Sequence, residues 1–422
     1  MSVFDSLVGQ PEVVEILQRA AAAARSLRPP AGTGFDQPAG DGLPAGLNQP
    51  ADLDQPAAGR AGAEMTHAWL FTGPPGSGRS VAARALAAAL QCDTGTGCGT
   101  CQGCHTTLAG THADVQLVVP DGLSIPVSQV RQLVLRAASA PAGGRWQVLL
   151  IEDADRLTEA AGNALLKAIE EPPVRTVFLL CTPSLHPDDI AVTVRSRCRV
   201  VALRQPPVPA VAELLTTRDA VPADVAAWAA AAAQGHVGRA RRLAADPAAR
   251  QRRESVLGVP RRLTNIGACF DAAGALIEAA EAEAEAAVAE RDATERAELT
   301  TALGGGGTGR GTAGAARGAA GQLKDLERRQ KSRATRTQRD ALDRALIDLA
   351  GFYRDVLAVS FGAPVAPVHA DIADMASAAA GKWRPESTLR RLEAVLACRE
   401  AIEANVKPRI AVEAMMLALW RG

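Results

Sequence analysis

The most constraining feature of the sequence is a short apolar run followed at once by a glycine- and proline-rich loop and an alanine-rich segment. Residues 67–90 read HAWLFTGPPGSGRSVAARALAAAL. We expect a buried strand over 68–71, a tight loop over 72–78 and a helix from Arg79 to Leu90. Strand, loop and helix in this order present backbone N–H groups to an anion, which predicts a phosphate-binding loop.

This loop departs from the usual phosphate-loop pattern at one position. Residues 73–80 fit G-x-x-x-x-G-K-[ST], except that an arginine stands at the lysine position. The candidate nucleotide-binding residues of the loop are Gly73, Gly76, Gly78, Arg79 and Ser80. Arginine keeps the positive charge, but its planar guanidinium is bulkier than an ammonium group. The pattern therefore indicates the fold more strongly than it indicates ATP chemistry.

Length, charge and apolar runs narrow the class of protein. The 422 residues are enough for two to four domains. Basic and acidic residues number 46 each, so the overall charge predicts no affinity for nucleic acid or membranes. The first residues, MSVFDSLVGQ, lack the pattern of a signal peptide, and no apolar run approaches the roughly 20 residues of a membrane helix. We expect a soluble, cytoplasmic protein.

A cluster of cysteines follows the predicted phosphate-loop helix. Its members are Cys92, Cys98, Cys101 and Cys104, with the spacing C-x5-C-x2-C-x2-C. Four thiolates on tight turns fill a tetrahedral shell around Zn²⁺, and a closed shell predicts a structural zinc site. His105 and His112 are near enough in sequence to replace a thiolate, but a full set of four leaves them unneeded. Free thiols in a loop are the alternative.

The next segments alternate between apolar runs and helical patterns, which predicts an α/β fold with a parallel sheet. We expect strands over 115–119, 148–151, 177–181 and 200–203, and helices over 127–137 and from Thr158 to Glu171. Glu152 and Asp153 follow one of these strands, and Thr182 lies at the tip of the next. In phosphate-loop enzymes, acids at this place hold magnesium and orient the attacking water. These three residues join the candidate nucleotide-binding set.

Two segments have the composition of loops. Residues 28–63 are rich in proline and glycine, contain near-repeats such as FDQPAG and LDQPAA, and are expected to be a disordered surface insertion. A short binding motif around Phe35 is the alternative. Residues 304–321 are expected to be a flexible glycine linker. A basic patch near this linker that touches nucleic acid is the alternative there.

The second half of the chain is predicted to be helical. A proline-rich hinge over 204–209 precedes a small helical region that extends to about residue 246. One later helix is expected to bury Leu342, Leu346, Leu349, Tyr353 and Leu357, and another Leu389, Leu392, Leu396 and Ile402. Residues 272–299 and 410–420 are expected to form a solvated and an apolar helix, respectively.

The order of these motifs resembles the clamp-loader family of AAA-plus proteins, and within it the delta-prime group of bacterial DNA polymerase III. Val8-Gly9-Gln10 precedes the phosphate loop and the four cysteines. NALLKAIEEPP then occupies 163–173, and Ser196-Arg197-Cys198 follows. The resemblance covers residues 4–203 well and extends more weakly to 235–243 and 402–420.

The resemblance implies a domain organisation and a set of partners. It implies an AAA-plus core over 1–203 with the zinc module at 92–104, a helical lid over 204–247, and a helical collar over 248–422. It further implies a ring of five subunits, with tau/gamma motor subunits and delta, which loads the sliding clamp on primer–template DNA. Arg197 would be an arginine finger that reaches the nucleotide of a neighbouring subunit. The implied location is cytoplasmic, at the nucleoid.

Three departures from the motor subunits of that family predict that this chain does not hydrolyse ATP. Arg79 replaces the loop lysine, and Glu152-Asp153 replaces Asp-Glu, so each acid is one methylene too long or too short. Gly238 stands where the motors have a lid arginine, and the adjacent Arg239 would point away by about 100° on a helix. Binding of ATP and Mg²⁺ without turnover stays open.

Two other functions compete with this interpretation. One is an ATP-hydrolysing motor subunit of the same family. The other is a zinc-dependent reader of nucleic acid unrelated to replication, which would require a basic zinc module. Because 92–104 contains no arginine or lysine, the sequence weighs against the second. As part of a polymerase holoenzyme, the chain itself is expected to have neither ATPase nor polymerase activity.

Overall fold

The computed structural model describes residues 2–27, 64–137, 141–143, 145–303 and 312–422. The insertion expected over 28–63 and the first part of the linker expected over 304–321 lie outside the described residues. Across the described residues, no helix combines the length and apolar character needed to cross a membrane.

The chain forms two compact units. One, called here the core unit, contains Met1–Pro120, Ser124–Ala220 and Gly235–Gly238. The other, called the helical unit, contains Asp121–Leu123, Val221–Gln234 and Arg239–Gly422. The boundaries of core, lid and collar given above stay predictions.

The core unit is built on a parallel sheet of five strands. The strands are β1 (Ala68–Thr72), β2 (Val115–Val118), β3 (Gln147–Ile151), β4 (Thr176–Thr182) and β5 (Arg199–Ala202). Their order across the sheet is β2-β3-β4-β1-β5, and every pair is parallel. β1, β3 and β4 are buried along their whole length, as central strands covered on both faces must be. The predicted α/β class and parallel sheet are confirmed.

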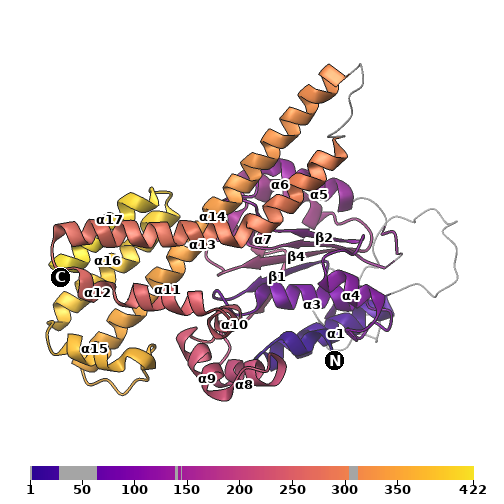
Figure 1. Ribbon diagram of the computed structural model, residues 1–422. Coiled ribbons are helices and arrows are strands. Elements are labelled where there is room, and N and C mark those ends of the chain that lie inside the picture. Colours follow the sequence, from indigo (N-terminus) through magenta and orange to yellow (C-terminus); the bar gives the residue numbers. More distant parts are fainter. Residues whose placement is uncertain (1, 28–63, 138–140, 144, 304–311) are drawn as a thin grey trace, which may run out of the picture. The chain divides into compact units, whose positions relative to one another are not determined.

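Alternate residues of β1 point into two separate hydrophobic cores, because side chains along a strand alternate between faces. Trp69 and Phe71 belong to one core, and Ala68 and Leu70 to the other. α1 (Pro11–Ser26) and α3 (Arg79–Gln91) cover the first face, and α5 (Val127–Ala137) and α6 (Glu159–Glu170) cover the second (Figure 1). The other helices of the core unit are η1 (Val3–Ser6), α4 (Gln102–Leu108), η2 (Ala154–Arg156), α7 (Val192–Arg195) and α8 (Val208–Arg218).

The helical unit is built around two long helices, α13 (Ile266–Ala302) and α14 (Thr312–Ser360). The shorter helices are α9 (Ala223–Ala232), α10 (Val237–Ala245), α11 (Pro247–Leu257), α12 (Val259–Arg262), η3 (Ala370–Ile372), α15 (Ala373–Ala380), α16 (Pro385–Glu403) and α17 (Pro408–Arg421). α14 buries Leu342, Leu346, Leu349 and Tyr353 completely, as predicted, and Leu357 is half-buried. The predicted linker is wrong in its second part, because α14 already begins at Thr312.

The apolar face predicted for α16 is right for Ile402, which is buried, and for Leu392, which packs against the core, but wrong for its other two residues. Leu389 and Leu396 are 46% and 40% exposed. The buried face consists of Thr388, Arg391, Val395, Cys398 and Ile402. Arginine is tolerated there because Nε of Arg391 donates a hydrogen bond of 2.8 Å to the carbonyl oxygen of Leu419, and its guanidinium lies 4.4 Å from the ring centroid of Trp383.

Candidate nucleotide cradle and metal centre

The loop between β1 and α3 requires glycine at the positions that the sequence singled out. Gly73, Gly76 and Gly78 have positive φ values of 154°, 85° and 93°. A Cβ atom on Gly73 would lie 2.4 Å from the carbonyl oxygen of Leu203. A Cβ atom on Gly76 would lie 2.5 Å from the ring of His236. Neither site can hold a larger residue without displacing backbone or a packed ring.

Arg79 folds back on its own loop. Its NH1 group donates a hydrogen bond to the carbonyl oxygen of Gly73. Within the same loop, the buried hydroxyl of Ser77 has no hydrogen-bond partner among the described residues. The cradle therefore has its glycines in place, while its cation is bound to the backbone of the loop itself.

Glu152, the first acid after β3, is paired with an arginine of α3. Nε and NH2 of Arg84 lie 3.0 and 2.8 Å from Oε1 of Glu152. A carboxylate neutralised in this way is less available to a metal ion. For Glu152 to bind a metal ion through Oε1, this carboxylate oxygen would have to leave Arg84.

The second acid, Asp153, has a left-handed backbone with φ 51° and ψ 55°. Its charge acts on the nearby carboxyl of Asp155, whose pKa is raised to about 6, first by burial and next by Asp153. The pKa of the Cys181 thiol in β4 is raised by burial first and by Glu152 next, while Arg79 and a hydrogen bond with Ser80 act in the opposite direction. The candidate residues thus converge around the end of β4.

Thr182 ends β4 and is fully buried. Its hydroxyl donates a hydrogen bond of 3.1 Å to the carbonyl oxygen of Ser184. The hydroxyl proton of this candidate nucleotide-binding residue is therefore used within the adjacent loop.

Arg197 lies just after α7 and is 40% exposed at its side chain. Its NH2 group lies 2.6 Å from Oε1 of Glu170, and its NH1 group donates a hydrogen bond of 2.9 Å to the carbonyl oxygen of Thr193. The structure thus places a guanidinium at the surface, held by its own chain. Its role as an arginine finger stays a prediction.

The contacts of three residues near the cradle were not predicted from the sequence. Gln10 is buried, donates from Nε2 to the carbonyl oxygens of Ser77 and Arg204, and so ties the loop to the end of β5. His236 packs its ring against Gly76. Arg84 is the third. Sequence signals existed for Gln10, which belongs to the Val8-Gly9-Gln10 motif, and for Arg84, which lies four residues after Ser80 on the same face of α3.

Arg239 pairs with Asp348 of α14 within the helical unit. That Arg239 does not replace the lid arginine expected at the position of Gly238 stays a prediction.

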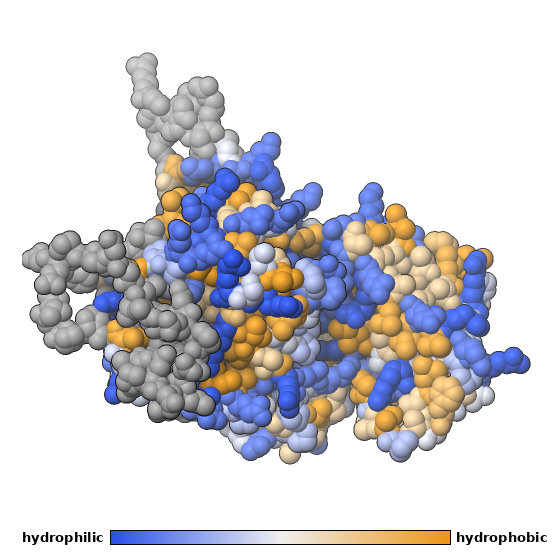
Figure 2. All heavy atoms as spheres, turned by 180° about the vertical axis from the view of Figure 1, so that it is seen from behind, coloured by the Kyte–Doolittle hydropathy of each residue, from blue (hydrophilic) through white to orange (hydrophobic). Residues whose placement is uncertain are grey.

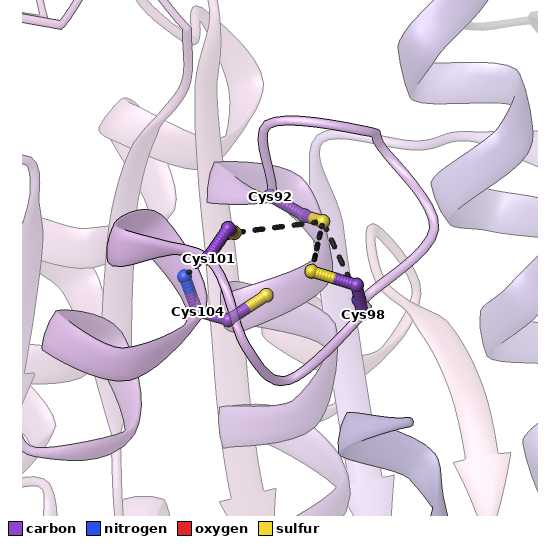
Figure 3. A group of neighbouring side chains, drawn as sticks. All are labelled: Cys92, Cys98, Cys101 and Cys104. Atoms are coloured by element: carbon purple, nitrogen blue, oxygen red, sulfur yellow. Dashed lines mark hydrogen bonds between the residues drawn. The ribbon is translucent and has the colours of Figure 1, made fainter. Parts of the chain in front are cut away.

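The four predicted metal ligands gather between α3 and α4 (Figure 3). Sγ of Cys92 lies 3.7 Å from Sγ of Cys98 and 3.9 Å from Sγ of Cys101, and all four sulfur atoms lie within 4.8 Å of one another. A tetrahedral zinc ion with Zn–S bonds of about 2.3 Å separates its sulfurs by about 3.8 Å. The donor set and spacing fit a structural zinc site.

Hydrogen bonds to sulfur lower the pKa of Cys92 and Cys98, whereas burial raises the pKa of Cys104. Burial raises the pKa of Cys92, but the hydroxyl of Thr94 and nearby backbone N–H groups outweigh it and lower the pKa to about 5. Sγ of Cys101 accepts from the backbone N–H groups of Asp93 and Cys104, at 3.4 Å each. His112 Nδ1 instead accepts a hydrogen bond of 3.1 Å from the backbone of Asp114.

The cysteine segment is also fixed to the start of the chain. The backbone N–H of Val3 donates a hydrogen bond of 2.9 Å to the carbonyl oxygen of Gly97. Gly97 has a φ of 69°, and a Cβ atom there would lie 2.7 Å from Val3. Cys92 and Cys104 belong to the same hydrophobic core as Phe4. A bound metal would therefore hold together α3, α4 and η1.

Comparisons with known proteins cover the core unit only in part. The sequence model of the family described as DNA polymerase III, delta subunit, matches residues 57–207. The tau subunit of DNA polymerase III from Salmonella typhimurium is 40% identical over 146 residues, which are 34% of this chain and 22% of that protein. The delta-prime subunit from Escherichia coli is 38% identical over 146 residues, which are 33% of this chain and 43% of that protein.

Among solved structures, a gamma subunit-related protein of DNA polymerase III from Thermotoga maritima covers 84% of this chain and 93% of its own. Its identity is 14% and its TM-score is 0.36. In the sequence comparisons, the chain spans 22% of the length of the tau subunit and 43% of the length of the delta-prime subunit.

Proposed function

Because the chain belongs to the DNA polymerase III clamp-loader family of delta-prime and gamma/tau subunits, we propose that it is a delta-prime-type subunit that does not hydrolyse ATP. The observation that supports this choice within the family is the state of the cradle. Arg79 binds its own loop, and Arg84 neutralises the acid at the magnesium position. A motor subunit would need the cation at position 79 for the phosphates and the acid at position 152 for the magnesium ion.

In this proposal the chain does not hydrolyse ATP itself, but supplies one residue to the reaction of a neighbouring subunit and a structural framework to the complex. Arg197 is offered to the triphosphate of an adjoining motor subunit, where a fixed guanidinium stabilises the charge that develops on the departing phosphoryl group. The zinc ion supplies cross-linking of the cysteine segment and no chemistry, since four thiolates close its shell. The partners are tau/gamma motor subunits, delta, the sliding clamp and, through the complex, primer–template DNA in the cytoplasm.

Exposed apolar side chains of the helical unit support association with other subunits. Phe361 and Ile410 are 71% and 57% exposed, and Leu389 and Leu396 are exposed on α16. Figure 2 shows apolar residues gathered at the surface of the helical unit, on the right of that view. Such patches are typical of surfaces that bind other proteins.

The alternative is an ATP-hydrolysing motor subunit. The 40% identity to a tau subunit favours it, since that match is as close as the match to a delta-prime subunit. Magnesium-dependent ATP turnover by the purified chain would support this alternative.

The decisive experiment measures ATP binding and hydrolysis by the chain alone and in a loader reconstituted with motor subunits, delta, clamp and primed DNA. We expect no turnover by the chain alone, and a loader whose ATPase falls at least tenfold with Arg197→Ala. The exposed Arg131 of α5 provides a matched control, because Arg131→Ala removes the same charge elsewhere in the core unit. Equal ATPase of wild type and Arg197→Ala would remove Arg197 from the site.

A further inference from the structure

Three arginines from three helices surround one carboxylate in the helical unit. Oε1 of Glu283 in α13 lies 2.5 Å from a guanidinium nitrogen of Arg242 in α10 and 2.5 Å from one of Arg344 in α14. Oε2 of Glu283 lies 3.1 Å from Nε of Arg252 in α11. This set is called here the Glu283 cluster.

The Glu283 cluster carries an excess of positive charge. Its other carboxylate is Asp246, 3.1 Å from Arg252 and 3.9 Å from Arg242, so three guanidiniums face two carboxylates. Burial raises the pKa of Glu283, but Arg344 and Arg242 outweigh it and lower that pKa. The arginine side chains remain 31–39% exposed, whereas Glu283 is 11% exposed. Solvent therefore reaches the cations while the carboxylate sits at their centre.

A hollow lies beside the cluster and continues into a groove. The Glu283 cluster lines a cavity of about 70 Å³. Arg252 and Glu283 also line a groove of about 340 Å³ between α11 and α13, so the two spaces are contiguous. The apolar part of its lining, called here the alanine floor, includes Ala275, Leu276 and Ala279 of α13 and Val256 of α11.

We propose that this cavity and groove bind a nucleoside polyphosphate, with its phosphates at the Glu283 cluster and its base along the alanine floor. Guanidinium forks match phosphate oxygens in geometry and charge, and here three of them converge. Glu283 occupies the place that phosphate oxygens would share. The floor offers methyl groups to a flat ring, and the groove has the size of a small-molecule site. This site is separate from the phosphate loop of the core unit.

The first test titrates sodium pyrophosphate into the full chain by calorimetry, in EDTA and at constant ionic strength. Arg252→Gln and Arg344→Gln should each weaken pyrophosphate binding about tenfold, since each removes one charge-assisted contact. Glu283→Gln should instead tighten it about tenfold, because the competing carboxylate is gone. Arg409→Gln, which removes an exposed arginine of α17, is the matched control and should change nothing.

The second test separates the base from the phosphates and this site from the phosphate loop. ADP and GDP should bind more tightly than pyrophosphate, and Ala279→Leu should abolish that difference without weakening pyrophosphate. Gly78→Asp, which disrupts the phosphate loop at a positive φ, should leave the binding of pyrophosphate, ADP and GDP unchanged.

If the Glu283 cluster serves only to join helices, these binding measurements give different results. Pyrophosphate would then fail to bind, or Glu283→Gln would bind it no better than wild type, and either result overturns the proposal. If Glu283→Gln does not fold, unchanged binding by Arg252→Gln and Arg344→Gln has the same meaning. Binding of a polyglutamate peptide without binding of pyrophosphate would assign the groove to an acidic protein partner and reject a nucleotide.

Discussion

At the scale of single residues, two arginines of α3 decide what the phosphate loop can do. Arg79 is bonded to the carbonyl oxygen of Gly73, inside the cradle. Arg84 lies beyond it and holds Glu152. The first contact occupies the group that would meet a phosphate, and the second neutralises the group that would meet a metal. Binding and turnover are therefore opposed by different side chains and can be separated by mutation.

We predict that Arg79→Lys strengthens nucleotide binding without restoring hydrolysis. Lysine lacks the fork that reaches back to Gly73, and a released hydrogen bond of about 1 kcal/mol corresponds to about fivefold in affinity. Turnover should stay absent because Arg84 still pairs with Glu152. Fluorescence anisotropy of a labelled ATP analogue measures the affinity, with Arg131→Lys as control. Unchanged affinity would show that Arg79 does not obstruct the loop.

His369 is a second residue whose state follows from its contacts. It is 1% exposed, Arg253 lies 3.0 Å from its Nδ1, and the carbonyl oxygen of Asp348 lies 3.0 Å from its Nε2. Because arginine can only donate, Nδ1 accepts and Nε2 carries the proton. Burial first, and the charge of Arg253 next, lower the pKa of His369, against the opposing effect of Asp348 and Asp355.

We therefore predict that His369 makes the helical unit less stable at acidic pH. Below about pH 6.5 the unfolded chain takes up a proton on this histidine, while the folded chain does so only at lower pH. The free energy of unfolding should fall as pH decreases from 7.5 to 5.5, at up to about 1.4 kcal/mol per pH unit for this group. His369→Gln, whose amide can accept from Arg253 and donate to Asp348, should flatten that dependence.

Urea denaturation of both proteins at pH 7.5, 6.5 and 5.5 provides the measurement. Asp155 acts in the opposite direction, because its pKa is raised to about 6 and its stabilising protonated form is lost as pH rises. Both proteins contain Asp155, so its effect cancels in the comparison. Parallel curves for wild type and variant would contradict the role given to His369.

At the scale of elements, the cysteine segment links α3, α4 and η1. It follows α3, leads into α4 and receives a backbone hydrogen bond from Val3 in η1. We predict one zinc ion per chain, lost when Cys101 and Cys104 are both replaced by serine. A ligand present at a hundred to a thousand times its Kd contributes about 3 to 4 kcal/mol, and we expect a loss of that size.

Elemental analysis and thermal unfolding test this prediction, and hydrogen exchange at the Val3 amide localises the effect. Exchange at Val3 should rise in the double variant, because its acceptor Gly97 lies in the released segment. Replacement of Cys181 and Cys269 by serine, both outside the cluster, should leave the zinc content unchanged. Carefully prepared wild-type protein without zinc would reject the site.

The bounds of the helices and strands were predictable from the sequence where the local residue pattern determines them. The helix predicted over 127–137 is α5 with the same bounds, and the predicted Thr158 caps α6 by accepting a hydrogen bond from Ala161. The face of α16 was not predictable, because burial of Arg391 depends on Trp383 and Leu419, which belong to other segments. The residues of the candidate site also separate into those that a local pattern predicts and those that depend on distant segments. Its glycines and cysteines have fixed spacings, whereas Gln10 acquires its role through Ser77 and Arg204.

At the scale of the whole molecule, the proposed function places the reacting nucleotide outside this chain. The residue offered to it, Arg197, is first bound by a residue of its own chain, Glu170, in an exposed ion pair. Glu170 belongs to the NALLKAIEEPP motif and Arg197 to the SRC triplet, so two of the motifs that carry the family resemblance meet in this pair. To act on a neighbour, the guanidinium must exchange Glu170 for the triphosphate.

We predict that Glu170→Gln raises the ATPase of a reconstituted loader modestly, in contrast to the loss expected for Arg197→Ala. An exposed ion pair is worth about 0–1 kcal/mol, so its removal should raise the rate up to about fivefold. The amide retains a hydrogen-bond acceptor for Arg197 and thereby keeps the guanidinium near its present position. Steady-state ATPase of loaders with either variant, at equal subunit concentrations, provides the comparison. A fall with Glu170→Gln as large as that with Arg197→Ala would mean that Glu170 orients the finger instead of competing for it.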